Sequence, residues 1–178
     1  MLYIVPEGVI EIGDGAFLGS KLEKVVLPSS IKKIGKEAYH CCKKLKDIVL
    51  PSSLLSIGES AFSYCCSLEE ISLPPKMEEL GDNAYLACSS LKEFRIPHGI
   101  KEIPDDCLAG CKALSDVFIP NTVTKIGAYA FFEAGIKNID LPSSIVLIGD
   151  SAFSLSKNLN NVMLRQYEVT SHRKIADS

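Results

Sequence analysis

The sequence predicts a repeat solenoid: a right-handed coil with one short parallel strand and one short helical turn in each repeat of about 23 residues. Three observations predict it. Prolines recur every 22 or 23 residues, three further rows (isoleucine or leucine, alanine, and an aromatic residue) keep the same interval, and an alternating apolar stretch precedes most of the prolines. Self-similarity at about 20–29 residues indicates stacked repeats. The prolines are Pro6, Pro28, Pro51, Pro74, Pro97, Pro120 and Pro142.

The strand of each repeat is expected just before its proline. In one repeat Ile48 and Leu50 flank Val49, and alternation at period two predicts that the two flanking residues point inward and Val49 outward. Proline ends the strand because it has no N–H to donate to a ladder. Polar pairs such as Ser52-Ser53 then form turns.

The short helical turn is expected after each Ile-Gly pair, where the pattern Ala-aromatic-x-x-Cys recurs, as in Ala61-Phe62-x-x-Cys65. An acid usually opens this segment, which suits the free N–H groups of a helix N-terminus. Pro104 replaces the glycine in one repeat. Because proline is favourable at a first helical position, we interpret Ile103-Pro104-Asp105-Asp106 as a capping variant and not as a site.

Together the repeats predict one domain, residues 1–164, of about seven turns. Neighbouring strands lie ~4.8 Å apart, so the rod is expected to be ~35 Å long. Arg165 stands where an eighth proline is due, and residues 165–178 are polar and lack the motif. We expect them to form a C-terminal tail or a crude cap.

Composition and charge exclude several classes of function. The formal net charge is −3 with acids and bases interspersed, so there is no basic footprint for nucleic acid. No apolar run approaches the ~18 residues that span a bilayer, so no membrane insertion is expected. Met1–Pro6 has neither a charged n-region nor an apolar h-region, so no signal peptide is expected there. This segment already matches the end of a repeat, which leaves open whether the chain is a fragment.

Seven cysteines cannot all pair within the chain, and there is no C-x-x-C motif or zinc spacing. Four of them form one row, in which other repeats have serine or alanine: Cys42, Cys65, Cys88 and Cys111. We expect these to be reduced, buried thiols, because parallel Cβ vectors are poor geometry for a disulfide. Cys41 and Cys66 should point elsewhere and be the more reactive pair. No metal or other cofactor is expected.

Motifs such as Leu68-x-x-Ile71-x-Leu73-Pro74, followed by Ile-Gly-x-x-Ala-aromatic-x-x-Cys, resemble the BspA-type leucine-rich repeats of bacteria and protozoa over residues 1–164. Familiar leucine-rich repeats carry an asparagine ladder after the strand. The corresponding residues here are Ser30, Ser53, Lys76, Gly99, Thr122 and Ser144, so polar groups must be satisfied differently. The resemblance implies a surface-exposed or secreted protein that binds host or matrix proteins, often as an adhesin.

The outward strand residues are the best candidates for a ligand-binding site. One row contains an apolar stripe near the N-terminal end and an exposed aromatic beside an arginine, a pairing common at interface hot spots. Its candidate residues are Val26, Val49, Ser72, Arg95, Phe118 and Asp140, with Ile4 and Met163 at the ends.

A second outward row is rich in acids: Asp47, Glu70, Glu93 and Asp116, with Lys24, Asn138 and Asn161 at its ends. Two interpretations stay open. The row is either a solvated face compensated by Lys46 and Lys92, with ion pairs worth ~0–1 kcal/mol each, or an acidic strip for a basic partner or a divalent cation.

These patterns predict a non-catalytic protein-binding module. His40, His98 and His172 fall in different repeat positions, and no Ser-His-Asp or paired-carboxylate arrangement emerges, so we expect no enzyme activity. The alternative is a structural segment of a larger protein or an intracellular scaffold, with end-to-end self-association. The resemblance favours the cell surface or secretion, whereas abundant unpaired cysteine suits the cytoplasm.

Overall fold

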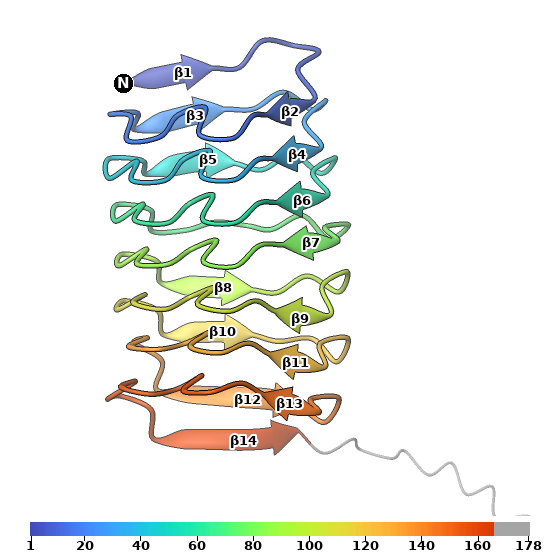
Figure 1. The fold of residues 1–178 in the computed structure, drawn as a ribbon, viewed down its shortest axis with the longest axis vertical. Coiled ribbons are helices and arrows are strands. Elements are labelled where there is room, and N and C mark those ends of the chain that lie inside the picture. Colours follow the sequence, from blue (N-terminus) through green and yellow to red (C-terminus); the bar gives the residue numbers. More distant parts are fainter. Residues whose placement is uncertain (166–178) are drawn as a thin grey trace, which may run out of the picture.

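Short strands stack in parallel along one side of the molecule, and a second row of strands lies along the other (Figure 1). The computed structural model describes residues 1–165. The first row consists of β1 (Leu2–Ile4), β3 (Lys24–Val26), β5 (Asp47–Val49), β8 (Glu93–Arg95), β10 (Asp116–Phe118), β12 (Asn138–Pro142) and β14 (Asn161–Arg165). We number the turns 1 to 7 by where each begins. Turns 1, 2, 3, 5, 6 and 7 begin with β1, β3, β5, β8, β10 and β12, and turn 4 begins at Glu70. The predicted solenoid is confirmed.

The second row was not expected. Its strands are two residues long, too short for an alternating pattern to be visible in the sequence. They are β2 (Glu11–Ile12), β4 (Lys33–Ile34), β6 (Ser56–Ile57), β7 (Glu79–Leu80), β9 (Glu102–Ile103), β11 (Lys125–Ile126) and β13 (Leu147–Ile148). The row of isoleucines before glycine supplies most of their inward residues, so each of turns 1 to 7 except turn 4 has two strands and not one.

Neither row is a continuous sheet. The first divides into β1-β3-β5, β8-β10 and β12-β14, and the second into β2-β4-β6-β7 and β9-β11-β13. The expected strand around Ile71 and Leu73 is therefore wrong: Glu70–Leu73 forms no strand, although Ile71 is buried.

The predicted helical turn is also wrong, since no helix occurs in residues 1–165. The segment after each glycine is a run of tight turns, which we call the turn segment. In turn 2, Cys42 N–H donates to the carbonyl of Tyr39 within the segment, whereas Tyr39 N–H donates 2.8 Å to the carbonyl of Ala61 in the next turn. Left-handed residues such as Glu37 (φ 55°) and Cys41 (φ 57°) break any helix and aim alternate N–H groups at the neighbouring turn.

These alternating bonds form what we call the turn-side ladder, which joins every pair of successive turn segments from turn 1 to turn 7. The acids expected to cap helices serve this stack instead. The Asp14 carboxylate accepts the N–H of Lys36 (2.8 Å), and the Asp105 carboxylate accepts the N–H of Ala128 (2.7 Å). Each acid thus caps a backbone donor of the following turn.

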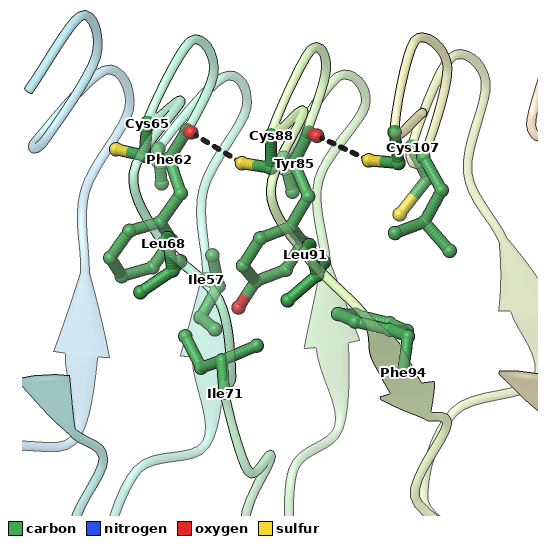
Figure 2. Close-up of a cluster of buried hydrophobic side chains, with 14 of the residues drawn as sticks. Ile57, Phe62, Cys65, Leu68, Ile71, Tyr85, Cys88, Leu91, Phe94 and Cys107 are labelled. Atoms are coloured by element: carbon green, nitrogen blue, oxygen red, sulfur yellow. Dashed lines mark hydrogen bonds between the residues drawn. The ribbon is translucent and has the colours of Figure 1, made fainter. Parts of the chain in front are cut away.

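The core lies between the two strand rows and the turn segments. Rings of the aromatic row stack nearly parallel, with centroids 5.1 to 5.3 Å apart along Phe17, Tyr39, Phe62 and Tyr85. Figure 2 shows Phe62 and Tyr85 in this stack, with leucine and isoleucine side chains beside them. Both tyrosine hydroxyls, of Tyr39 and Tyr85, are buried without a hydrogen-bond partner.

Hydroxyl side chains replace the asparagine ladder. Ser53 Oγ donates 2.6 Å to the carbonyl of Ile31, and Ser144 Oγ donates 2.6 Å to that of Val123. These serines are bonded turn residues, as expected. At the last strand, Arg165 pairs with Pro142, which confirms that Arg165 occupies the position of the eighth proline. The remainder of the expected tail, residues 166–178, lies outside the described residues.

Candidate functional site

The two predicted outward rows do lie on one face of the first strand row, which we call the strand face. In β8 the central Phe94 is buried, whereas Glu93 and Arg95 on either side are exposed. The same pattern holds in β3 and β5, where Val25 and Ile48 are buried. Successive strand residues point to opposite faces, so residues two apart share the outer surface. We keep the names variable row, for the row of Val26 and Val49, and acidic row, for the row of Asp47 and Glu70.

The apolar stripe is confirmed as a contiguous, exposed part of the variable row. Ile4 pairs with Val26, and Val26 with Val49, so the three side chains stand one above another. They are 63%, 40% and 72% exposed. Exposed apolar side chains in register are a feature of interaction surfaces.

A crevice of about 400 Å³ lies beside this stripe, between turns 2 and 3. Its floor and walls include Val26 and Val49, and also Leu27 and Pro51 just beyond the strand ends. Ser29 and Ser52 complete its rim. From the sequence, Leu27, Pro51, Ser29 and Ser52 were expected to stabilise the fold and not to contact a ligand. The signal that could have found them is that prolines and serines at the ends of stacked strands must share one edge of the strand face.

Arg95 and Phe118 are brought together as expected, but Phe118 is half-buried and not fully exposed. The Arg95 guanidinium lies over the Phe118 ring, 5.9 Å from its centroid, and also contacts the Asp116 carboxylate at 3.4 Å. These residues and Asp140 line a crevice of about 280 Å³ between turns 6 and 7. Arginine is therefore held in place by one charge and one ring.

The acidic row is compensated by other residues than predicted. Lys24, in its own row, pairs with Asp47, and Arg95 pairs with Asp116. Lys92 pairs with Glu69 and lowers the pKa of that carboxyl through a hydrogen bond. Within residues 1–165, neither Glu70 nor Glu93 forms an ion pair. All of these pairs are exposed, so each contributes little to stability.

Ser72 lies at the least regular part of the strand face. It is exposed and lines a crevice of about 220 Å³ between turns 3 and 4, together with Glu70 and backbone of β5. No backbone hydrogen bond among the described residues joins Glu70–Leu73 to β5. The strand face is thus divided into an apolar N-terminal part, an acidic centre and an Arg95–Phe118 cluster.

All seven cysteines are free, and five are buried. The four-cysteine row points inward as predicted, and each thiol donates to a main-chain carbonyl of the preceding turn; Figure 2 shows the Cys88 thiol directed at Phe62. Burial raises the pKa of the Cys111 thiol to about 12. Cys41 and Cys66 are half-buried, and their greater reactivity stays a prediction.

No catalytic or metal-binding arrangement is found among the described residues. His40 lies against the Tyr64 ring, and no group of three or more His, Cys, Asp or Glu side chains in residues 1–165 is placed to hold a metal ion. His172 lies outside the described residues. The structure contains no membrane-spanning helix within the described part of the chain.

The repeats that form this geometry match a known family in sequence. The family model for BspA-type leucine-rich repeat regions matches residues 3–115 and 78–176, with six copies. The chain belongs to the BspA-type leucine-rich repeat family. No curated protein matches its sequence.

Two solved structures of leucine-rich proteins are similar in fold to this chain. A leucine-rich cell surface protein from Faecalibacterium prausnitzii is 29% identical over 92% of this chain, with a TM-score of 0.87. A leucine-rich repeat protein from T. pallidum is 26% identical over 89% of this chain and 78% of its own, with a TM-score of 0.63. The chain spans about half the length of the Faecalibacterium protein, 47% of it.

Proposed function

We propose that this BspA-type array is a non-catalytic protein-binding module that recognises its partner through the strand face. The observation that carries the proposal is the exposed stripe of Ile4, Val26 and Val49 beside the crevice between turns 2 and 3. A stripe of this kind excludes water when a partner covers it, and an apolar partner side chain fits the crevice between Val26 and Val49.

The centre of the strand face supports a partner that also carries basic groups. Glu70 and Glu93 lie one turn apart and form no ion pair within residues 1–165. A lysine or arginine of the partner placed over them gains a charge-assisted hydrogen bond, and like charges there repel acidic competitors. The Arg95–Phe118 cluster supplies a second anchor about two turns from the apolar stripe.

We further propose that the protein acts at the cell surface or after secretion, as an adhesin-like protein. The support is family membership and the printed description of the Faecalibacterium relative as a cell surface protein. The seven free thiols support the alternative, a cytoplasmic interaction scaffold. Location of the tagged full chain by cell fractionation, with surface proteolysis of intact cells, distinguishes the two.

The binding proposal is tested by affinity capture with matched variants. The wild-type chain, the triple variant Val49→Ala, Arg95→Ala and Phe118→Ala, and the control Val146→Ala are immobilised at equal density. Val146 is 84% exposed but lies in turn 7, away from the stripe. A partner that binds wild type and control, and is lost from the triple variant with its circular dichroism intact, supports the proposal. Equal capture by all three contradicts it.

A structural role in a larger assembly is the second candidate, with end-to-end self-association. Both ends of the stack expose apolar side chains: Leu2, Tyr3 and Ile4 at one end, and Val146, Leu147 and Ile148 at the other. Unpaired strand edges with apolar side chains favour association. Sedimentation velocity tests this role: concentration-dependent oligomers that disappear in Leu147→Lys support assembly, and a monomer at all concentrations excludes it.

A further inference from the structure

Turns 4 and 5 are joined differently from all other neighbouring turns in residues 1–165. Three kinds of hydrogen bond link successive turns on the strand side of the solenoid: bonds along the first strand row, bonds along the second, and bonds from a hydroxyl side chain to a carbonyl. At the junction of turns 4 and 5 all three fail together.

The second strand row is interrupted because of Pro104. In the other turns the residue after the inward isoleucine or leucine is glycine, and its N–H donates to the preceding turn: Gly81 to Ile57 (2.9 Å) and Gly127 to Ile103 (2.8 Å). Proline has no N–H to donate to Leu80. Lys101 likewise lacks the bond that Thr124, its equivalent in turn 6, makes to Lys101 (2.8 Å).

Pro104 also prevents a close approach of the two turns at its own position. Glycine at this position allows a very close approach: a Cβ on Gly81 would lie 2.4 Å from the backbone nitrogen of Glu59, and one on Gly127 would lie 2.5 Å from the Asp105 carboxylate. Real Cβ atoms do not come so close, and proline carries one. At Pro104 turn 5 therefore cannot settle onto turn 4 as turns 4 and 6 settle onto the turns before them. The close approach is kept at Gly99, where a Cβ would lie 1.9 Å from the carbonyl oxygen of Met77. The interpretation of Pro104 as a helix cap is wrong, because residues 1–165 contain no helix.

The hydroxyl bond fails because of Gly99. It occupies the position from which Ser53 donates to Ile31, Thr122 to Ile100, and Ser144 to Val123. Glycine has no side-chain donor, and the junction loses this link as well.

The first strand row is interrupted at the same height. Glu70–Leu73 pairs neither with β5 nor with β8. Beside the interrupted strand one backbone bond remains, from Lys92 N–H just before β8 to the carbonyl of Glu69 just before Glu70, at 3.0 Å. An exposed ion pair between Lys92 and Glu69 adds little. Farther along the loops, Ala113 N–H donates to the carbonyl of Ser89 at 3.1 Å, and Ser115 N–H to that of Lys92 at 2.9 Å.

The turn-side ladder crosses the junction intact. Asn83, Tyr85 and Ala87 donate to the carbonyls of turn 5 at 2.9, 3.0 and 2.7 Å. The Cys111 thiol adds a bond to the carbonyl of Tyr85 at 3.3 Å. One edge of the junction is therefore fully bonded, and the Asp105 N–H beside Pro104 also donates to the Asp82 carboxylate at 3.2 Å. The opposite edge, at the first strand row, is held by packing of Phe94 against Tyr85 and by the Lys92 bond.

We propose that the junction of turns 4 and 5 is a hinge, about which the two halves of the solenoid bend with the turn-side ladder as the axis. At the positions of the two strand rows, bending there breaks only the Lys92 bond, whereas bending at the junction of turns 5 and 6 breaks bonds in both strand rows and a hydroxyl bond. The motion changes the curvature of the strand face, moving the apolar stripe of Val26 and Val49 relative to the Arg95–Phe118 cluster. Hinges are built from a few positions with weak local bonding.

Hydrogen exchange of the whole wild-type chain, followed by mass spectrometry, tests the hinge without any partner. Amides of residues 101–103 are expected to exchange at least about tenfold faster than those of residues 124–126, their equivalents one turn later. The segments 93–95 and 116–118 form a second matched pair in the first row. Equal protection within both pairs overturns the hinge.

Pro104→Gly provides an independent test, because it restores both the donor and the close approach found in the other turns. Exchange of residues 101–103 is expected to slow toward the rate of residues 124–126. Pro120→Gly, in turn 6, controls for the greater flexibility that glycine gives the unfolded chain, and is expected to leave residues 101–103 unchanged. If Pro104→Gly does not slow exchange at residues 101–103 while the protein remains folded, the assignment of the hinge to Pro104 is overturned.

Discussion

The thiol of Cys88 donates a hydrogen bond to the main-chain carbonyl of Phe62, 3.1 Å away in the preceding turn. The same bond recurs from Cys65 to Tyr39 and from Cys111 to Tyr85, and Ser156 makes it with a hydroxyl to Phe131 at 2.7 Å. The cysteine row is therefore a ladder of side-chain donors that ties each of turns 2 to 7, except turn 6, to the one before it.

Ala134 is the member of this row that has no donor. We expect Ala134→Ser to stabilise the protein by about 0.5–1.5 kcal/mol, because the new hydroxyl reaches the carbonyl of Leu108 as Ser156 reaches Phe131. Ala130→Ser, in the neighbouring buried alanine row, is the control and is expected to destabilise. Urea unfolding measures both, and a loss of stability in Ala134→Ser equal to that in the control contradicts the ladder.

Removal of a thiol from the ladder should have the opposite effect. Cys88→Ala deletes a bonded, fully buried group and is expected to lower the free energy of unfolding by about 1–3 kcal/mol. Cys66→Ala, at a half-buried position, should cost less than about 0.5 kcal/mol. Thermal unfolding of the two variants compares them directly, and equal costs would show that burial in this row is unimportant.

The unpartnered hydroxyls of Tyr39 and Tyr85 predict that their removal stabilises the protein. A buried hydroxyl without a partner costs about 1–3 kcal/mol, and phenylalanine already occupies this row at Phe62 and Phe131. We expect Tyr85→Phe to raise the free energy of unfolding by about 1 kcal/mol or more, and Phe62→Tyr to lower it. A destabilised Tyr85→Phe would falsify the assignment of that hydroxyl as unsatisfied.

Alkaline pH should weaken the fold through the buried thiols. Burial raises the pKa of Cys111 from 9.0 to about 12, and raises those of Cys88 and Cys107 as well. Above about pH 9 the unfolded chain loses these protons and the folded chain keeps them, so the free energy of unfolding falls as pH rises through the interval from 9 to 12. Each thiol contributes a slope of up to about 1.4 kcal/mol per pH unit.

Cys107→Ala is the matched variant for this titration. Alanine is the usual residue of that row, and the substitution removes one titrating group from the core. The slope of stability against pH, measured by urea unfolding between pH 8 and 11, should become shallower by about one thiol. An unchanged slope would mean that Cys107 does not titrate with the unfolded chain.

The hydroxyl ladder gives a further prediction. Lys76 stands in turn 4 where Ser53 stands in turn 3. Lys76→Ser is expected to add a bond to the carbonyl of Leu54 and to stabilise by about 0.5–1 kcal/mol, and Ser53→Ala to destabilise by about the same amount. Denaturant midpoints of the two variants and the wild type check this prediction, and a shift of both in one direction contradicts it.

The repeat interval, the inward rows and the outward rows could all be predicted from sequence, because buried positions tolerate few residue types and so repeat visibly. Ile48 and Val49 were assigned to opposite faces from alternation alone. The turn segments could not be predicted, because Ala61-Phe62-x-x-Cys65 has the spacing of a helical face, and left-handed residues such as Ser60 carry no glycine signal. A two-residue strand such as β6 is too short to show a period.

On the strand face, the outward direction of each side chain was predicted better than its contacts with neighbouring side chains. Which residues point outward follows from alternation, but which lysine meets which acid depends on the lateral offset between strands. Lys92 reaches Glu69 for that reason, and not Glu70 or Glu93. The crevice beside Val49 depends on backbone separation between turns, which no residue pattern records.

The uniform span of the turn-side ladder also sets how the chain can fold. Its bonds join residues 21 or 22 positions apart, as in Phe17 to Ala38 and Tyr85 to Cys107. Every added turn therefore closes a loop of the same size and carries nearly the same entropic cost, wherever it lies in the chain. Folding can begin on any adjacent pair of turns and spread one turn at a time. A longer array therefore needs more folding steps, but no added step is slower than those before it.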